Sequence, residues 1–176
     1  MKNREQLNDF LAAEEHKAFT VARISTGNAS DALDVMQDAM LAFVSKYADS
    51  HEADWRALFY RIVYNKLTDF HRRRNFRQGI LRFFKQPDET QESEQDQFPA
   101  TGHSPEAALE FENSVTALEQ ALGQLPLRQQ QAVILRAWQG LDTTETATAM
   151  QLSAGSVKTH YARGLAKLRE LLQEEI

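Results

Sequence analysis

Apolar residues recur at intervals of three and four along most of the chain, the spacing that places them on one buried side of an α-helix. In the first half this pattern predicts helices over 6–25, 31–47 and 55–76. Gly27 and Asn28 interrupt the pattern after the first segment, which forms one or two helical pieces, and a polar stretch precedes Trp55.

The second predicted helix has Ser30 or Asp31 as its cap and one polar flank. Its predicted buried stripe consists of Leu33, Met36, Met40, Val44 and Tyr47, with Phe43 at the edge. Along one side of that stripe fall Asp34, Gln37, Asp38 and Leu41. An acidic flank with one exposed leucine is a surface that a basic protein can dock on, although solvated helix sides with such charges are more common.

The third predicted helix differs between its two sides. The apolar side consists of Trp55, Leu58, Phe59, Ile62 and Phe70, with the stem of Lys66 among them. The other side carries Arg61, Asn65, Thr68 and Arg72, with Tyr60, Tyr64 and His71 beside them. Guanidinium, amide, hydroxyl and aromatic groups together can hold a phosphate backbone and stack on unpaired bases. We therefore predict a surface that binds single-stranded nucleic acid; the alternative is a surface helix with incidental tyrosines.

The net charge of -5 at first argues against a nucleic-acid partner, but charge is segregated along the chain. Basic residues dominate 54–85, whereas 86–127 contains no Lys or Arg. Residues 86–105 are acidic, proline-containing and poor in apolar side chains, so they form a flexible acidic linker.

After this linker the helical spacing returns. Ser104 and Pro105 are the predicted N-cap and first residue of one helix, and Pro126 begins the next, which Gly140 ends. No segment shows sustained alternation of the kind strands have. The predicted fold is all-α, with two small helical bundles: a domain over 1–85, the linker over 86–105, and a domain over 106–176.

The segment Gly140–Leu171 reads as two helices joined by a tight turn, with Thr143 or Thr144 as the first cap, an end near Gln151 and Ser153 as the second cap. In the second helix the buried stripe is Val157, Tyr161, Leu165, Leu168 and Leu172. The opposite face and its borders carry Ser156, Lys158, Thr159, His160, Arg163 and Lys167. Short donors near the cap and basic arms further along suit base edges and phosphates of duplex DNA, as in a helix-turn-helix. The alternative is an ordinary helical hairpin.

Several function classes are excluded or disfavoured. The absence of cysteine excludes a disulfide scaffold and a thiol nucleophile, and no apolar run is long enough for a signal peptide or a membrane span, so we expect a cytoplasmic protein without membrane insertion. Scattered histidines give no metal spacing, and Glu14, Glu15 and His16 read as an exposed helix turn. We expect no catalytic residue, metal or cofactor. A stand-alone helix-turn-helix regulator remains an alternative, and an enzyme is a weaker one.

Three stretches in this order resemble the extracytoplasmic-function sigma factors of bacterial RNA polymerase. Residues 31–38 look like the family's polymerase-docking motif, and 55–62 with Asn65 and Asp69 look like its minus-ten region. Positions from Leu125 to Arg163 match its minus-thirty-five region. The chain departs from the family at Leu33, Ala39 and Thr146, and at Gln151, where the turn usually has glycine.

The resemblance implies a mechanism without covalent chemistry by this chain. Core RNA polymerase would be bound by Asp34, Gln37 and Asp38. Promoter DNA would be bound at two elements, with the melted minus-ten strand on the first domain and the duplex minus-thirty-five element on the second. The linker would thread through the polymerase toward its active centre. An anti-sigma protein is the expected inhibitory partner.

Overall fold

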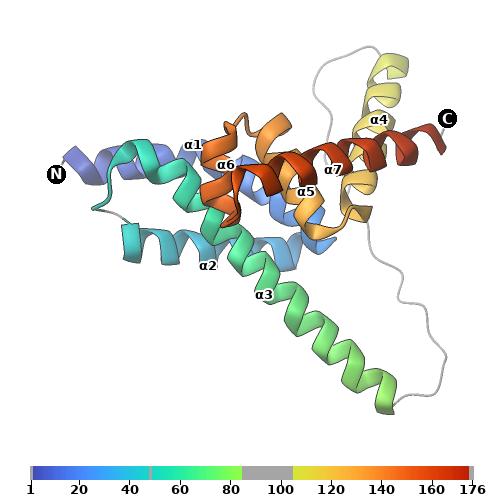
Figure 1. Ribbon diagram of the computed structural model, residues 1–176, viewed down its shortest axis with the longest axis horizontal. Coiled ribbons are helices and arrows are strands. Elements are labelled where there is room, and N and C mark those ends of the chain that lie inside the picture. The colour runs from blue at the N-terminus through green and yellow to red at the C-terminus, as the bar shows by residue number, and fades with distance from the viewer. Residues whose placement is uncertain (1, 48, 85–104, 175–176) are drawn as a thin grey trace. The chain divides into compact units, whose positions relative to one another are not determined.

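The computed structural model describes residues 2–47, 49–84 and 105–174, and within them the regular elements are all helices (Figure 1). The chain divides into two compact units, whose boundary falls within the segment 85–104. The predicted all-α fold in two helical groups is therefore confirmed. Ser104 and the rest of the predicted linker before Pro105 lie outside the described residues.

The first unit contains three helices, α1 (Lys2–Thr26), α2 (Ala29–Tyr47) and α3 (Trp55–Phe84), and each packs against the other two. Its core is aromatic where the three meet. The Phe10 ring centroid lies 5.7 Å from that of Phe43, 5.6 Å from that of Trp55 and 5.9 Å from that of Phe59. Phe43, Trp55 and Phe59 are fully buried, so the burial of large rings is a main source of this unit's stability.

The turn between α1 and α2 follows the predicted break but uses a different cap. Gly27 has a positive φ of 84°, a conformation that costs glycine little. The Asn28 side-chain oxygen accepts a 2.8 Å hydrogen bond from the backbone N–H of Asp31, and its Nδ2 donates to Asp31 Oδ2 at 2.6 Å. The prediction of Ser30 or Asp31 as the cap is wrong because Asn28 already satisfies the first turn.

The buried side of α2 is rotated from the predicted one. The buried residues are Ala32, Val35, Met36, Ala39 and Phe43. Leu33 and Val44 are 50% and 42% exposed, so placing them in the buried stripe was wrong. The small side chains of Ala32 and Ala39 allow α2 to approach its neighbours closely. The apolar residues of α2 were therefore compatible with two different buried sides, and the structure uses the one that contains these alanines.

Helix α3 begins at Trp55 as predicted, after a short 3-10 turn η1 (Glu52–Asp54). The Trp55 Nε1–H donates a 3.2 Å hydrogen bond to the carbonyl of Ser50, which fixes the connection to the helix start. The helix continues to Phe84, whereas the sequence predicted an end near Phe76. No proline interrupts residues 77–84, so the helix continues past the predicted end.

The second unit contains α4 (Pro105–Gln124), α5 (Leu127–Val133), the π-helical turn η2 (Ile134–Trp138), α6 (Thr143–Met150) and α7 (Ala154–Glu174). Helix α7 packs on α4, α5 and α6. The predicted end at Gly140 is confirmed by its positive φ of 67°. The Arg136 guanidinium donates to the carbonyl of Leu141 at 2.7 Å and lies 5.7 Å from the centre of the Tyr161 ring, which ties the π turn to α7.

A glycine sets the distance between α5 and α7. Gly164 is buried, and a Cβ there would lie 2.6 Å from Val133 Cγ2 and 3.1 Å from the carbonyl oxygen of Gln129. The two backbones therefore approach at a separation that no larger residue permits. Within the described part of the chain, no helix is both long and apolar enough to cross a bilayer.

Candidate functional site

The predicted polar and basic stripe lies on the surface of α3. Asn65, Thr68 and Arg72 are exposed and Arg61 is half-buried. The Thr68 hydroxyl donates to the carbonyl of Tyr64 at 2.8 Å, and Arg72 pairs with Asp69 at 3.0 Å. Exposed ion pairs of this kind contribute little stability, so the Arg72 guanidinium can exchange Asp69 for a phosphate at low cost. The placement on one face is confirmed, and DNA binding by these residues stays a prediction.

Two predicted members of that stripe are not on the surface. Tyr60 is fully buried and Tyr64 is 2% exposed. Burial raises the pKa of both phenols, and for Tyr60 the nearby Glu14 carboxylate raises it further. The prediction that these rings stand beside the stripe, ready to stack on bases, is wrong. The first half of α3 is covered by both α1 and α2, so it buries more of its circumference than the single stripe that periodicity assumed.

A buried carboxylate joins α1 to α3. Glu14 is 6% exposed, and its Oε2 accepts a 2.8 Å hydrogen bond from the Tyr60 hydroxyl. Its Oε1 lies 3.5 Å from Lys17 Nζ and 3.7 Å from Arg56 Nε. The prediction that Glu14 belongs to an exposed turn is therefore wrong, although Glu15 and His16 are exposed. The available signal was the helical spacing, which places position 14 between Leu7 and Ala18 on the buried side of α1.

The middle of α3 is also tied to the end of α1. Ser25 Oγ and His71 Nε2 are 3.0 Å apart, and Arg74 donates a 3.1 Å hydrogen bond to the carbonyl of Thr26. Burial lowers the pKa of His71, as does the neighbouring Arg74 charge, whereas an interaction with the backbone of Ser25 raises it. Arg74 is exposed like Arg72 and Arg73, but it caps an α1 carbonyl, which separates its role from theirs.

The predicted docking flank on α2 is exposed. Asp34, Gln37 and Asp38 face solvent, and Leu41 beside them is 71% exposed. Asp38 also pairs with Lys66 of α3, with Oδ2 and Nζ 3.5 Å apart. The exposure of this flank is confirmed, whereas its contact with polymerase stays a prediction.

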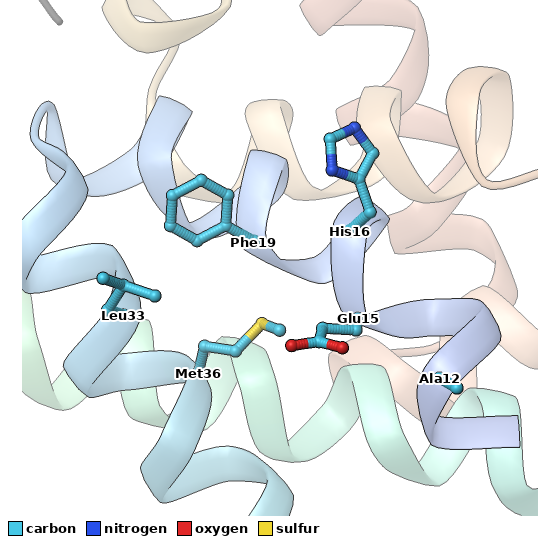
Figure 2. Close-up of a pocket in the computed structure, with 6 residues that line it drawn as sticks. All are labelled: Ala12, Glu15, His16, Phe19, Leu33 and Met36. Atoms are coloured by element: carbon cyan, nitrogen blue, oxygen red, sulfur yellow. The ribbon is translucent and has the colours of Figure 1, made fainter. Parts of the chain in front are cut away.

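A surface pocket of about 330 Å³ lies between α1 and α2 and was not predicted. Figure 2 shows Ala12, Glu15, His16 and Phe19 on the α1 side and Leu33 and Met36 on the α2 side. It forms where the exposed Leu33 leaves the α1–α2 contact incomplete, next to the docking flank. Leu33 and Met36 both belong to the predicted buried stripe of α2, and that stripe predicted a packed surface at this place rather than a pocket.

In the second unit α6, a turn and α7 form the predicted helix-turn-helix layout. The cap of α6 is Asp142 rather than Thr143 or Thr144, because its carboxylate accepts from the Glu145 N–H at 2.8 Å while the Glu145 side chain accepts from the Asp142 N–H at 2.7 Å. This reciprocal capping box satisfies two N–H groups that a threonine alone could not. The buried hydroxyl of Thr146 donates to the carbonyl of Asp142 at 2.7 Å, so the departure at this position is accommodated.

The turn places Gln151 in the left-handed conformation, with φ 55° and ψ 44°. The Leu152 N–H donates to the carbonyl of Ala147 at 3.1 Å and the Gln151 N–H to that of Thr148 at 3.4 Å, the hydrogen bonds of a Schellman ending. Glutamine therefore occupies the left-handed position at which the family usually has glycine, so this departure leaves the glycine-type turn intact.

Helix α7 begins at the predicted cap. Ser153 Oγ accepts from the Ser156 N–H at 3.2 Å and lies 2.9 Å from Ser156 Oγ. Val157 is buried, while the predicted Tyr161, Leu165, Leu168 and Leu172 are half-buried. The predicted DNA face is accessible: Lys158, Thr159, Arg163 and Lys167 are exposed, and Ser156 and His160 are half-buried. Its contact with DNA stays a prediction.

Family models match both units. Residues 12–77 match sigma-70 region 2, and residues 116–168 match sigma-70 region 4. The RNA polymerase sigma-E factor of Streptomyces antibioticus is 32% identical over 146 residues, covering 81% of this chain and 71% of that protein. The ECF RNA polymerase sigma factor SigX of Bacillus subtilis is 33% identical over 150 residues, covering 81% of this chain and 73% of that protein.

Solved structures share the fold. The sigma factor RpoE of Bartonella quintana, crystallised with the anti-sigma factor NepR, matches with a TM-score of 0.70 at 20% identity, covering 94% of this chain and 96% of that one. CnrH in complex with the cytosolic domain of CnrY matches with a TM-score of 0.61 at 24% identity, covering 97% and 89%. With both regions matched in order, the chain belongs to the extracytoplasmic-function (ECF) sigma factors, the transcription initiation factors that direct core RNA polymerase to promoters.

Proposed function

We propose that the first domain, residues 1–85, divides the work of initiation between two of its surfaces. The docking flank of α2, Asp34, Gln37 and Asp38, binds a basic surface of core polymerase. The exposed stripe of α3 binds the melted minus-ten strand. The observation that carries this proposal is that an exposed flank with two acids and an exposed stripe with arginine and amide groups lie on two different helices of one compact unit. Each surface can therefore bind a partner of different charge.

On the α3 stripe each group has a distinct use. The Asn65 amide can pair with the edge of an unpaired base, because amides offer both a donor and an acceptor. The Arg61 and Arg72 guanidinium groups suit the phosphates on either side. Thr68 adds hydroxyl lone pairs, since its proton is used by the carbonyl of Tyr64. The buried Tyr60 and Tyr64 act through packing rather than by stacking on DNA.

The second domain, residues 106–176, reads the duplex minus-thirty-five element with α7. Ser156 and Thr159 lie near its N-terminal end, where a recognition helix meets base edges. The Thr159 hydroxyl donates to the carbonyl of Gly155 at 3.1 Å and so presents its lone pairs outward. Lys158, Arg163 and Lys167 with His160 supply the longer arms for phosphates and guanine edges.

The linker and an inhibitor complete the proposal. The acidic segment 86–105 occupies a path that RNA otherwise takes through the polymerase, as its charge favours. An anti-sigma protein covers the docking flank and α7; the support for this partner is that the similar solved structure of the sigma factor RpoE is a complex with the anti-sigma factor NepR. The chain itself performs binding only, without covalent chemistry.

Run-off transcription with reconstituted polymerase on genomic DNA tests this function. We expect core polymerase with this chain to start transcription at promoters that core polymerase alone ignores. Asp34→Ala should reduce binding to core polymerase, whereas Asp9→Ala, an exposed acid on α1, is a matched control that should not. A chain that binds duplex DNA tightly by itself and never associates with core polymerase would instead be a stand-alone regulator.

A further inference from the structure

The C-terminal part of α3 presents an aromatic ring to solvent. Phe76 is 68% exposed. No other phenylalanine, tyrosine or tryptophan side chain that the structure describes in the first unit is exposed. Figure 1 shows this part of α3 continuing past α1 and α2. A large ring left uncovered on a helix that is longer than its packing requires is a feature that the fold alone does not explain.

Phe76 extends the α3 stripe. It follows Arg72 by four residues, and Arg72 follows Thr68 by four, so the three side chains lie on one face of the helix. The stripe therefore continues one turn beyond the residues that the sequence singled out. The rings of Tyr60 and Tyr64, which the sequence placed beside this stripe, are buried, whereas the ring of Phe76 is exposed on it.

The surroundings of Phe76 are cationic. Arg72, Arg73 and Arg77 are exposed around it, while Arg74 is turned to the carbonyl of Thr26. An apolar protein surface would be a poor partner for a ring surrounded by arginines, since docking would remove those charges from water. A polyanion with exposed aromatic faces matches both the charge and the ring.

We propose that Phe76 stacks on an unpaired base of the melted promoter strand, one helical turn beyond Arg72, while Arg73 and Arg77 hold the flanking phosphates. The inference rests on the proposed strand-binding role of α3. Stacking on a ring tolerates any base, so Phe76 contributes affinity for opened DNA at the edge of the melted segment rather than sequence choice.

The test uses holoenzyme assembled from core polymerase and the full chain, on a promoter mapped by the run-off experiment. The first probe is fork-junction DNA with a duplex upstream part and a single-stranded non-template minus-ten segment. The second probe is a fully paired duplex of the same sequence. We expect Phe76→Ala to weaken binding of the fork probe about tenfold and to leave binding of the duplex probe and of core polymerase unchanged. Phe76→Trp should retain the affinity for the fork, and Phe76→Leu should not.

Gln78→Ala is the matched control, because Gln78 is exposed two residues later on a different face of α3. Unchanged fork binding by Phe76→Ala, or full activity of Phe76→Leu, would overturn the stacking role. A loss of core-polymerase binding would show that the ring contacts protein and would overturn it equally. If the wild-type holoenzyme neither initiates nor binds the fork, the proposed function itself fails; if it binds and Phe76→Ala binds equally well, only this inference fails.

Discussion

The Tyr60 hydroxyl donates a 2.8 Å hydrogen bond to the carboxylate of Glu14, and both side chains are buried between α1 and α3. The two residues are far apart in the sequence, and the bond fixes the helix that carries the proposed strand-binding stripe onto the N-terminal helix. A buried charge held by a hydroxyl and by nearby Lys17 and Arg56 makes this contact specific, because a lost partner would leave the carboxylate under-solvated.

Removing that hydroxyl should destabilise the first unit. We expect Tyr60→Phe to lower the free energy of unfolding by about 1–3 kcal/mol, since the ring still packs but the buried carboxylate loses a donor. Denaturant unfolding of the full chain measures this. Tyr47→Phe is the control, as Tyr47 is half-buried in the same unit. Equal stability of Tyr60→Phe and Tyr47→Phe would contradict the importance of the Glu14 contact.

Because Tyr60 and Tyr64 are buried, we expect the first unit to lose stability at alkaline pH. Burial raises the pKa of Tyr60 and Tyr64 above the ordinary value of about 10, so the folded protein keeps two protons that the unfolded chain releases. Their contribution to stability is fully present below pH 10 and is lost as the pH rises above it. The free energy of unfolding should fall by about 1.4 kcal/mol per pH unit for each phenol. Denaturant unfolding curves recorded at increasing pH measure how steeply the free energy of unfolding falls with pH. The double variant Tyr60→Phe, Tyr64→Phe should show a smaller fall. An equal fall in that variant would refute the assignment of this pH dependence to the two phenols.

Replacing Gln151 in the turn of the helix-turn-helix by glycine should stabilise the second unit. Gln151 adopts a left-handed conformation that costs a residue with a side chain roughly 1 kcal/mol more than glycine. We expect Gln151→Gly to raise the stability of the second unit by about 0.5–1 kcal/mol relative to Gln151→Ala, which also removes the side chain but retains the Cβ. Thermal unfolding of the two variants compares them, and a glycine variant no more stable than the alanine one would show that the turn is not strained.

The contact between α5 and α7 should not tolerate a methyl group. A Cβ at Gly164 would lie 2.6 Å from Val133 Cγ2 and close to the Gln129 carbonyl, which belongs to the backbone and cannot move aside alone. We expect Gly164→Ala to destabilise the second unit by about 1–3 kcal/mol. In Gly155→Ala the nearest atom would be Ser153 Oγ at 3.9 Å, so this variant on the same helix should be neutral or stabilising. The difference in denaturation midpoint between the two variants is the measurement, and equal midpoints would contradict the close approach.

Much of the architecture followed from the spacing of apolar residues. The all-α fold and the starts of α3 and α7 were predictable, because each depends on local sequence. The left-handed conformation of Gln151 was not, because glutamine rarely adopts it outside a turn that requires it. The spacing of apolar residues could not predict how much of a helix's surface its neighbouring helices bury. The burial of Tyr60 and Tyr64 and the exposure of Leu33 follow from three helices packing mutually, which is a property of tertiary structure.

The caps show a similar limit at the level of single hydrogen bonds. The structure uses Asn28 and Asp142 as the N-caps of α2 and α6. The predicted caps, Ser30 or Asp31 and Thr143 or Thr144, lie one to three positions later in the sequence. Several adjacent residues in each stretch can serve as caps, and the choice depends on where the preceding chain enters the helix. Glu14 was missed because a charged residue is assigned to the surface unless its partners are known.

The proposed role of α3 is tested most directly by separating strand opening from duplex binding in holoenzyme carrying Asn65→Ala. With core polymerase saturated by the variant, closed-complex affinity is measured on an intact promoter duplex, and strand opening by the reactivity of unpaired thymines to permanganate. We predict that opening falls at least severalfold while closed-complex affinity is retained, because Asn65 meets a base only after the strands separate. An equal loss of both, or no loss of opening, would contradict the assignment of the minus-ten strand to this face of α3.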